Sequence, residues 1–379
     1  MKVKEVTVFS NGDSSKMRTW SNIPYFFTET MLSKGIKVNR VDLSPLLLIK
    51  IMFNMTVYAV LRILNMNSTY NYFRSFIHFT NVRYRIKKAI KQYPDSDANI
   101  FLTFSFSSTG LTLKPSIQFC DWTYDHYFKY ILDRKPGFWE KQCIKREDSQ
   151  IEGSDLVFPL FPSVAQYMKK RYKNTNIHYL GCVINSLYDV SETDMIKHRK
   201  NSNNILFVGS KKYIEGAQSL INAFEKLKQK LPQLILHIIG MTFGDFDNLP
   251  KDVYCYGYLD KGKDADRELY YKLFREAKIF VNTTPKLGAI MATIEAMYFY
   301  VPVITSPHEH FTGIFGNNIN FGYYCEQNSP ILIEGSILKI LNNISYESLC
   351  LNAHKSVEEF TWNAYMDKLL IKIEDKINN

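Results

Sequence analysis

The sequence predicts an α/β protein of two domains, each a parallel sheet wound with helices. Two observations lead to this fold class. Short apolar runs typical of buried strands alternate with amphipathic stretches of helical length in both halves of the chain, and such alternation favours parallel sheets. In addition, 379 residues with 46% hydrophobic side chains are enough for two domains of ordinary size.

The first half of the chain begins with a predicted strand, Val6–Phe9, followed by a glycine-containing turn. The helix predicted over residues 22–34 ends at Gly35, because glycine suits the position after a helix. A strand over residues 36–42 follows it. The later predicted elements of this half are strands at 99–103, 116–119, 156–158 and 177–180, a helical stretch at 124–146 that Pro136 and Gly137 break, and a helix at 163–172.

Residues 45–64 form an unusually apolar stretch in the first half. The stretch is long enough to cross a membrane, but Lys50, Asn54 and Arg62 interrupt it, and charged groups are costly in a bilayer core. The basic and aromatic residues that follow, as far as Lys91, are typical of helices that lie in the headgroup region of a membrane. The pattern also fits a pair of ordinary core helices, so both interpretations stay open.

A polar segment, residues 184–203, separates the two halves and is predicted to be a linker. The sequence therefore predicts a first domain over 1–183, a second domain over 204–360, and a closing segment over 361–379. The predicted elements after the linker are strands at 204–208, 234–239 and 253–256 and helices at 216–230, 268–276 and 362–375.

The most informative stretch of the second half is residues 283–307. The apolar runs Ala277–Val281 and Val301–Ile304 predict buried strands, and a loop and a helix carrying Glu295 lie between them. Such a unit places the loop and the helix start at the carboxyl edge of a parallel sheet, where these sheets bind ligands. Free N–H groups there suit phosphate oxygens, and a carboxylate suits sugar hydroxyls. The stretch therefore favours a nucleotide-sugar site, although a lone glutamate on a helix is usually a surface residue.

Charge and cysteine content narrow the range of partners. The net charge of +10 favours partners that carry phosphate, such as nucleotide sugars or anionic lipid headgroups. No zinc-ligand spacing and no RNA-binding aromatic motif is visible, so neither a metal nor nucleic acid is expected. The six cysteines are scattered, as in a reduced cytosolic protein. The first residues lead directly into a strand, so no signal peptide is expected.

Four segments of the second half occur in a characteristic order and spacing: ILFVGSKKYIEGAQSLINAFEKL, VYCYGYL, YYKLFREAKIFVNTTP and IEAMYFYVPVIT. They resemble the carboxyl-terminal domain of GT-B-fold glycosyltransferases, and most closely glycosyltransferase family 4, the glycosyl transferases group 1. The first domain resembles the family more weakly, through residues 154–172 and 179–185, and the helix around Trp362 resembles the one that crosses back to that domain. The resemblance implies two Rossmann-like domains that face a central cleft.

The resemblance also implies a donor site in the second domain. Glu295 matches the second glutamate of the family's Glu-x7-Glu motif, which holds the donor ribose. Gly209 matches the glycine after the first strand of this domain, and Tyr258 falls where the nucleobase is held. The loop whose backbone faces the donor sugar and phosphates matches Gly288, Ala289, Ile290 and Met291.

In the first domain the resemblance points to two loops. One carries Gly12 and Asp13 and matches the glycine-bearing loop near the scissile bond. The other carries Cys120 and Asp121, where the family often has His-Asp. Asp121 and Asp13 are therefore the candidate catalytic residues, with Asp125 as a further candidate base. Asp121 also suits the cap of the helix that follows, and the sequence does not decide between these roles.

Three departures from the family pattern bear on the mechanism. Leu287 stands where the first glutamate of the motif belongs, and an apolar side chain accepts no hydrogen bond from a sugar hydroxyl. Ser210 and Glu215 replace the basic pair that binds the donor diphosphate. Cys120 replaces the histidine of the first domain. These losses put the retaining stereochemistry in question.

The charge missing at the diphosphate has three candidate replacements, Lys211, Lys212 and Lys286. Lys211 and Lys212 also fit a solvated turn. A His-Glu-His run at residues 308–310 follows a strand end. It fits either a ligand contact or an exposed polar loop, and no third ligand for a metal is visible beside it.

The sequence thus predicts a glycosyltransferase that moves a sugar from a nucleotide-diphosphate donor to an acceptor, with retention and without cofactor or metal. The basic, apolar first domain favours a lipid-linked or membrane-surface saccharide as acceptor, as in the synthesis of lipopolysaccharide or capsule. The expected location is the cytoplasm, with peripheral contact to the inner face of the cell membrane. Two alternatives stay open: an inverting enzyme with an aspartate base, and a degenerate GT-B protein that only binds.

Overall fold

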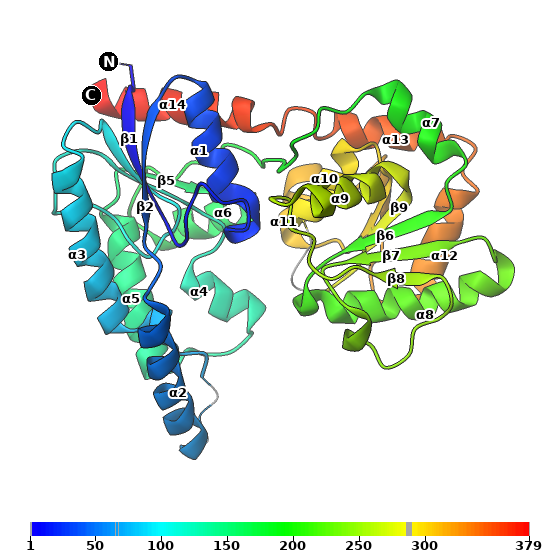
Figure 1. Cartoon of the computed structure of the whole chain (residues 1–379), viewed down its shortest axis with the longest axis horizontal. Helices are drawn as coiled ribbons and strands as arrows, with labels where there is room; N and C mark the ends of the chain where they lie inside the picture. The colour runs from blue at the N-terminus through cyan, green and yellow to red at the C-terminus, as the bar shows by residue number, and fades with distance from the viewer. Residues whose placement is uncertain (1, 65, 67, 286–289, 379) are drawn as a thin grey trace. The chain divides into compact units, whose positions relative to one another are not determined.

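The computed structural model describes residues 2–64, 66, 68–285 and 290–378 and divides the chain into two compact units. The first unit comprises Met1–Cys182 together with Trp362–Asn379, and the second comprises Val183–Thr361. Each unit is a parallel sheet with helices packed on it (Figure 1). The α/β class that the alternating pattern predicts is therefore confirmed.

The first unit contains a five-stranded sheet in the order β2-β1-β3-β4-β5, in which all neighbours are parallel. Its strands are β1 (Glu5–Ser10), β2 (Lys37–Asp42), β3 (Ala98–Phe101), β4 (Ser116–Cys120) and β5 (Leu156–Pro159). Its helices are α1 (Ile23–Ser33), α2 (Leu47–Ile63), α3 (Phe76–Gln92), α4 (Tyr124–His126), α5 (Phe138–Glu152), α6 (Pro162–Arg171) and α14 (Trp362–Asn378), with the shorter turns η1 (Trp20–Asn22), η2 (Tyr72–Arg74) and η3 (Tyr127–Ile131).

Aromatic side chains fill both faces of the first sheet. On one face Phe9 stacks on Phe101 with ring centroids 4.5 Å apart, in a cluster that includes the buried side of α3. On the other face Phe119 contacts Phe27 of α1 and Trp362 of α14. Helix α14 therefore completes the core of the first unit, although the whole second unit separates it in sequence from the strands that it covers.

The second unit contains a six-stranded parallel sheet in the order β11-β10-β9-β6-β7-β8. Its strands are β6 (Asn204–Val208), β7 (Ile235–Ile239), β8 (Val253–Cys255), β9 (Ala277–Asn282), β10 (Val303–Thr305) and β11 (Gly322–Tyr324). Its helices are α7 (Glu192–Lys200), α8 (Ile214–Lys230), α9 (Asp264–Glu276), α10 (Ile290–Tyr298), α11 (Glu309–Phe315), α12 (Pro330–Leu341) and α13 (Tyr346–Lys355), with the turns η4 (Lys211–Tyr213) and η5 (Phe243–Asp245).

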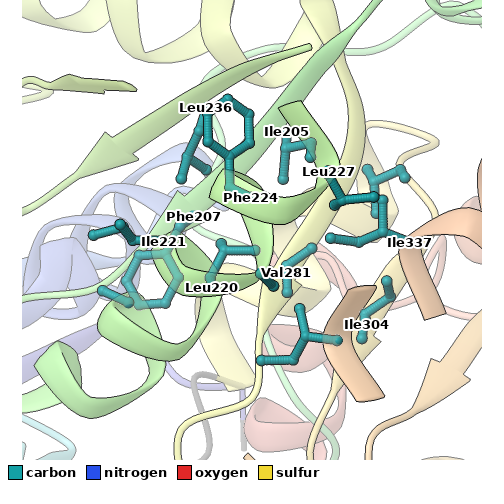
Figure 2. Close-up of a cluster of buried hydrophobic side chains, with 14 of the residues drawn as sticks. Ile205, Phe207, Leu220, Ile221, Phe224, Leu227, Leu236, Val281, Ile304 and Ile337 are labelled. Carbon is teal, nitrogen blue, oxygen red and sulfur yellow. The ribbon is translucent and has the colours of Figure 1, made fainter. Parts of the chain in front are cut away.

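One face of the second sheet is buried beneath α8 and α12. Figure 2 shows Phe207 of β6 and Val281 of β9 in one cluster with Leu220 and Phe224 of α8 and Ile337 of α12, all fully buried. The apolar residues of α8 recur at helical spacing, which is why the sequence predicts this helix. Burial of each such side chain stabilises the folded state by about 1.5–3 kcal/mol. The cluster therefore holds in place the strand ends at which the site is built.

The segment predicted as a linker, residues 184–203, contains helix α7 and lies in the second unit. The Arg199 side chain is fully buried there. A buried guanidinium is tolerated where acceptors surround it. The linker prediction is wrong because it rests on polar composition alone. Composition does not show that the fold buries one of the charged side chains of this segment. The guanidinium donates, at 3.0–3.1 Å, to the carbonyl oxygens of Arg275, Ala277 and Tyr300.

Two further predictions for the first unit meet different outcomes. The helical stretch at 124–146 is broken near Pro136 and Gly137, into α4 with η3 and then α5. The strand predicted at 177–180 is reduced to one parallel bridge between Ile177 and Val157.

Helix α2 differs from the other long helices of the first unit because none of its residues is buried. Core helices are thus the correct interpretation only for α3, whose buried residues include Val82 and Ile86. In Figure 1, α2 extends away from the sheet of its own unit. Among the residues that the structure describes, no helix is both long enough and apolar enough to cross a membrane.

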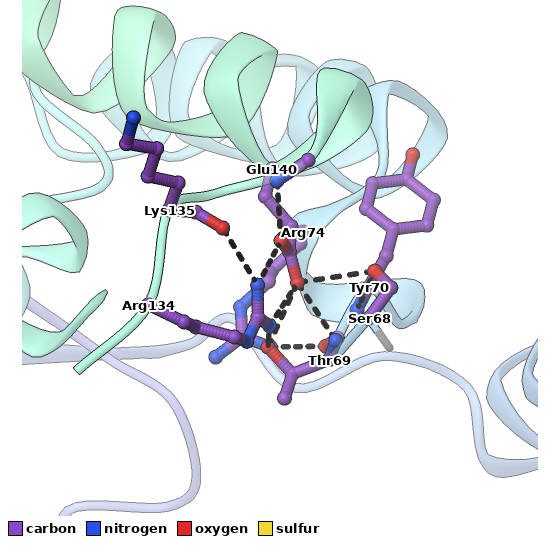
Figure 3. A network of polar contacts seen from close by, with 8 residues as sticks. Ser68, Thr69, Tyr70, Arg74, Arg134, Lys135 and Glu140 are labelled. Carbon is purple, nitrogen blue, oxygen red and sulfur yellow. Dashed lines mark hydrogen bonds and ion pairs between the residues drawn. The ribbon is translucent and has the colours of Figure 1, made fainter. Parts of the chain in front are cut away.

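A buried charge network fixes the chain where it leaves α2 (Figure 3). Glu140 of α5 is fully buried and binds Arg134, with both guanidinium nitrogens 2.8 Å from its carboxylate oxygens. The N–H groups of Thr69 and Gly137 donate to the same carboxylate at 2.7 and 2.8 Å. Burial alone would raise the pKa of Glu140, but these bonds outweigh it and lower the pKa to about 2. The network joins residues 68–74 to the start of α5.

Candidate functional site

The predicted donor residues gather at the carboxyl edge of the second sheet. Strand β6 ends at Val208 and is followed by Gly209, while β9 ends at Asn282 before the segment that leads to α10. Since β6 and β9 are neighbours in the sheet, their loops leave the edge side by side. Strand β9, helix α10 and strand β10 follow one another as predicted, and residues 286–289 of the loop lie outside the described part of the chain.

Close packing holds these loops together. A Cβ atom on Gly216, in the first turn of α8, would lie 2.1 Å from Oγ1 of Thr284. A Cβ atom on Gly240, which has φ +98°, would lie 2.5 Å from the carbonyl oxygen of Gly209. Thr284 donates its hydroxyl to Asn282 Oδ1 at 2.7 Å. The start of α8 thus packs directly against the β9 loop.

Glu295 lies on α10 and is buried, with 5% of its surface exposed. Lys261 Nζ donates to its Oε1 at 2.5 Å, and the Tyr270 hydroxyl donates to its Oε2 at 2.9 Å. The interpretation of Glu295 as an ordinary surface residue is therefore wrong. Because each carboxylate oxygen has two lone pairs, the side chain retains capacity for hydroxyl donors.

Lys261 is a residue of this site that the sequence analysis missed. It is 5% exposed, and its ammonium group also donates to the Asn185 carbonyl oxygen at 2.9 Å. The ammonium lies 4.2 Å from the ring centroid of Tyr270. Burial lowers the pKa of Lys261, and the Glu295 carboxylate opposes that shift. A signal was available, because Lys261 follows β8 by a few residues and thus belongs to another strand end of the same edge.

Tyr258 lies in the same loop as Lys261, after Gly257, whose φ is +65°. Its side chain is 57% exposed. The loop therefore carries an exposed aromatic ring three residues before a buried lysine.

Lys211 and Lys212 lie in η4, between β6 and α8. The Lys211 ammonium lies 3.0 Å from Asp245 Oδ1, yet its side chain is 76% exposed. Hydrogen bonds from the Thr242 N–H and the Lys211 ammonium are the largest causes that lower the pKa of Asp245 to about 2. Lys212 is exposed. Both lysines stand directly before the first turn of α8, where free N–H groups suit an anion.

The remaining predicted donor residues fall at or before α10. Ile290 and Met291 form its first turn. Lys286, Gly288 and Ala289, together with Leu287, lie outside the described residues. The His-Glu-His run begins α11, and His310 is fully buried, so the run is not an exposed loop. Within the described part of the chain, no cluster of His, Cys, Asp or Glu is arranged to hold a metal.

The first unit places Gly12 and Asp13 in the loop after β1. Gly12 has φ +115°, and a Cβ atom there would lie 2.7 Å from Cγ2 of Thr19, so only glycine fits. Asp13 Oδ1 accepts the N–H and hydroxyl of Ser15 at 2.9 and 2.7 Å. These bonds hold the pKa of Asp13 below its usual range, which makes it a weak base.

Asp121 follows β4 and is half-buried. Its Oδ1 accepts the N–H of Trp122 at 2.9 Å and the thiol of Cys120 at 3.3 Å. Burial raises the pKa of Asp121 and raises that of Cys120 well above its usual range. The cap of α4 is Thr123, whose hydroxyl accepts the His126 N–H at 3.1 Å. Asp121 is therefore not the helix cap.

Asp13 and Asp121 lie at the same edge of the first sheet but are not neighbours. Strand β3 lies between β1 and β4, which separates their loops by about two strand spacings, roughly 10 Å. Asp125 is already paired with Arg171 at 2.9 Å. Of the three aspartates, Asp121 thus has the environment best suited to accept a proton.

Glu147 of α5 is a second buried carboxyl that the sequence analysis did not single out. It is 3% exposed and accepts the Tyr124 N–H at 2.5 Å and the Ser105 hydroxyl at 3.0 Å. Burial raises its pKa to about 8. No local pattern distinguishes it from Glu152, an exposed acid of the same helix.

Comparison with known proteins identifies the domain to which this edge belongs. Residues 191–356 match the family model of glycosyl transferases group 1. The second unit is therefore similar to a group 1 glycosyltransferase domain. The match covers β6 to β11 with the Glu295 helix, so the predicted resemblance to group 1 glycosyltransferases and the predicted enzyme class are confirmed. No curated protein matches the chain in sequence.

Solved structures extend the likeness to the whole chain. Sucrose-phosphate synthase from Thermosynechococcus elongatus superposes with a TM-score of 0.70 at 14% identity, over 98% of this chain and 99% of that one. HepE from Anabaena, in complex with UDP and glucose, superposes with a TM-score of 0.64 at 12% identity, over 98% of this chain and 99% of HepE. A glycosyltransferase from Rickettsia africae superposes with a TM-score of 0.65 at 14% identity, over the full length of both chains. These similarities show the GT-B fold that the resemblance implies.

Proposed function

We propose that this protein transfers a sugar from a nucleotide-diphosphate donor to a saccharide acceptor that is lipid-linked or lies at a membrane surface. The observation that carries the proposal is Glu295, buried at the ligand-binding edge of a group 1 glycosyltransferase domain. The UDP and glucose bound to HepE, a structure of the same fold, support a donor of this class.

In the proposed complex the donor lies along the carboxyl edge of the second sheet. Glu295 accepts hydrogen bonds from the ribose hydroxyls, and Tyr258 stacks on the base. The start of α8, beside Gly209, and the first turn of α10, with Ile290 and Met291, face the diphosphate. Lys261 fixes the orientation of the Glu295 carboxylate by its bond at 2.5 Å.

The developing charge on the leaving diphosphate is stabilised by Lys211, Lys212 and Lys286 together with the N–H groups at the start of α8. An exposed ion pair is worth at most about 1 kcal/mol, so Lys211 can leave Asp245 for a phosphate at little cost. A metal ion is then not required. We expect activity to survive chelation by EDTA.

Retention of the anomeric configuration is the proposed stereochemical outcome. One observation favours the inverting alternative: Asp121, with a pKa raised by burial, is suited to take the proton of an acceptor hydroxyl. Anomeric NMR of the product separates the two outcomes directly.

The acceptor half of the proposal rests on the first unit. No residue of its α2 is buried, most of them are apolar, and the segment that follows is basic, as a membrane-surface acceptor requires. Synthesis of a cell-surface polysaccharide such as lipopolysaccharide or capsule, at the cytoplasmic face of the membrane, fits these features.

The test is transfer or hydrolysis from a panel of nucleotide sugars by the wild type and by Glu295→Gln. Glu225→Gln, an exposed glutamate on α8, is the matched control. We expect activity with the wild type and control and a loss of about 100-fold or more in Glu295→Gln. Absence of donor binding by the wild type would refute both enzymatic proposals and leave the degenerate binding protein.

A further inference from the structure

The polar and apolar sides of α2 are reversed relative to a helix on a water-exposed surface. The side chains that face outward are apolar, such as Met52, which is 70% exposed, and Ile63, which is 81% exposed. A surface helix normally turns its apolar side inward. The half-buried strip that faces the protein instead contains a lysine and an asparagine, in the set Lys50, Phe53, Asn54, Val57 and Leu61.

Three polar side chains of α2 find partners inside the protein, whereas Arg62, in its last turn, is exposed and long enough to reach a headgroup layer. Asn54 Oδ1 accepts the Tyr72 N–H at 2.8 Å, and the Lys50 ammonium lies 4.9 Å from the ring centroid of Phe73. The exposed Thr56 donates its hydroxyl back to the carbonyl oxygen of Met52 at 2.9 Å. In a hydrocarbon medium polar groups must be satisfied in this internal way, so α2 meets the condition for leaving water.

The exposed apolar surface is large and continuous along the chain. Twelve large apolar side chains between Leu46 and Met66 each have at least 44% of their surface exposed. The largest apolar patch of a typical soluble monomer covers about 300–600 Å² and is itself often functional. A helix of 17 residues exposed in this way needs an apolar partner.

A hollow of about 240 Å³ lies beside α2, between the helix and the start of α5. Val57, Val60 and Leu61 line it from α2, and Tyr70 and Trp139 line it from the other side. Tyrosine and tryptophan rings favour the boundary between hydrocarbon and headgroups. The Glu140 network ties the segment that carries Tyr70 to the start of α5, which carries Trp139, and so fixes the side of the hollow opposite α2.

The charge around α2 distinguishes between two partners that could cover its apolar face, a second copy of the chain and a lipid surface. No Asp or Glu occurs between Leu43 and Pro94, whereas this segment contains eight Lys and Arg residues. A second copy of the chain would bring two cationic segments together, and like charges oppose such an association. Anionic lipid headgroups are complementary to this segment.

We propose that α2 inserts its outward face into one leaflet of an anionic phospholipid bilayer, with lipid chains filling the hollow beside Trp139. Insertion to about 5–10 Å is typical of helices that lie in the interface. The inference deepens the proposed function, on which it rests for its purpose, because it names the surface at which a lipid-linked acceptor would meet the enzyme.

The test is flotation of the full-length protein with phosphatidylcholine vesicles, with and without about one-third phosphatidylglycerol. We expect flotation with the anionic vesicles only, and weaker binding at high salt. Met52→Glu should reduce the bound fraction about tenfold or more, because it removes one apolar side chain that insertion would bury in the bilayer. Ile344→Glu makes the same charge change at a fully exposed apolar residue of the second unit and should bind as the wild type does.

A second readout follows Trp139, which is 55% exposed in water. Lipids with brominated chains should quench its fluorescence, and Trp139→Phe should remove that component. Equal flotation of Met52→Glu and the wild type, or no flotation with anionic vesicles, would overturn the inference. A lipid-free dimer that Met52→Glu dissociates would assign the face to a second copy instead. Flotation needs no nucleotide sugar, so its failure leaves the transferase proposal standing.

Discussion

Lys261 Nζ lies 2.5 Å from Oε1 of Glu295, and both side chains are 6% exposed. The pair joins the loop after β8 to α10 across the ligand-binding edge of the second sheet. A buried charge that loses its partner is costly, whereas a buried pair removed as a whole costs much less. The pair therefore couples the stability of the domain to the geometry of the proposed ribose ligand.

This coupling is testable by a double-mutant cycle. Lys261→Met should lower the free energy of unfolding by about 3–5 kcal/mol, because it leaves Glu295 buried without its cation. Adding Glu295→Gln should restore part of this loss, so that the two effects are not additive. Urea unfolding of the four proteins measures the coupling. Strict additivity would show that the two side chains do not interact.

Two glycines of the second unit should respond to alanine with opposite signs. Gly216→Ala should destabilise the protein by more than about 1 kcal/mol, because its Cβ would meet Thr284 Oγ1 at 2.1 Å and the Thr284 nitrogen at 2.9 Å. Gly335→Ala, inside α12 with no atom within 4 Å of the new Cβ, should stabilise it by about 0.5–1 kcal/mol. Thermal unfolding midpoints that shift in the same direction would contradict this reading of the packing.

The Glu140 network should make the first unit sensitive to acid. The folded-state pKa of Glu140 is lowered to about 2, from an ordinary value of 4.5. Its contribution, about 2–3 kcal/mol, is therefore complete above pH 4.5 and is lost as the pH falls toward 2. Glu140→Gln should be less stable at pH 7 and should lose less stability between pH 5 and pH 2. Urea unfolding across this range measures both, and parallel pH profiles would refute the assignment.

Lys211 and Asp245 should act on donor binding in opposite directions. Lys211→Ala should weaken UDP binding about tenfold, because a charge-assisted bond to phosphate is worth about 1.5–3 kcal/mol. Asp245→Asn removes the competitor that lies 3.0 Å from the ammonium group and should leave binding unchanged or tighter. Lys226→Ala, an exposed lysine on α8, is the control. Calorimetry with UDP measures all three. Equal affinities of Lys211→Ala and the control would remove Lys211 from the site.

Asp121 should control the pH dependence of transfer if it serves as the base. Asp121→Asn should lower the rate by about 100-fold or more and abolish the acid limb of the pH–rate profile. In the wild type that limb should lie above the usual range of aspartate, since burial raises the pKa of Asp121. Asp95→Asn, an exposed residue of the first unit, is the control. A profile that keeps its acid limb in Asp121→Asn would assign the proton transfer to another group.

The sequence predicted the repeating features well, because each leaves a periodic trace. Alternating strands and helices gave the α/β class, and the spacing of Leu220, Phe224 and Leu227 gave α8. Glu295 was found because its strand–loop–helix context is local. Lys261 was missed because its partner lies 34 residues away in the chain. Arg199 was missed for a similar reason, since its acceptors come from residues more than 70 positions later.

The packing of Trp362 against Phe27 and Phe119 sets an order of events during synthesis. Domains generally fold as units while the chain leaves the ribosome. The second unit has all its strands as soon as Tyr324 has emerged, whereas the first unit must wait for α14 with an open aromatic face. The part of the protein that is made first is therefore the last to mature, and its unfinished face is exposed to chaperones for as long as the second half is being translated.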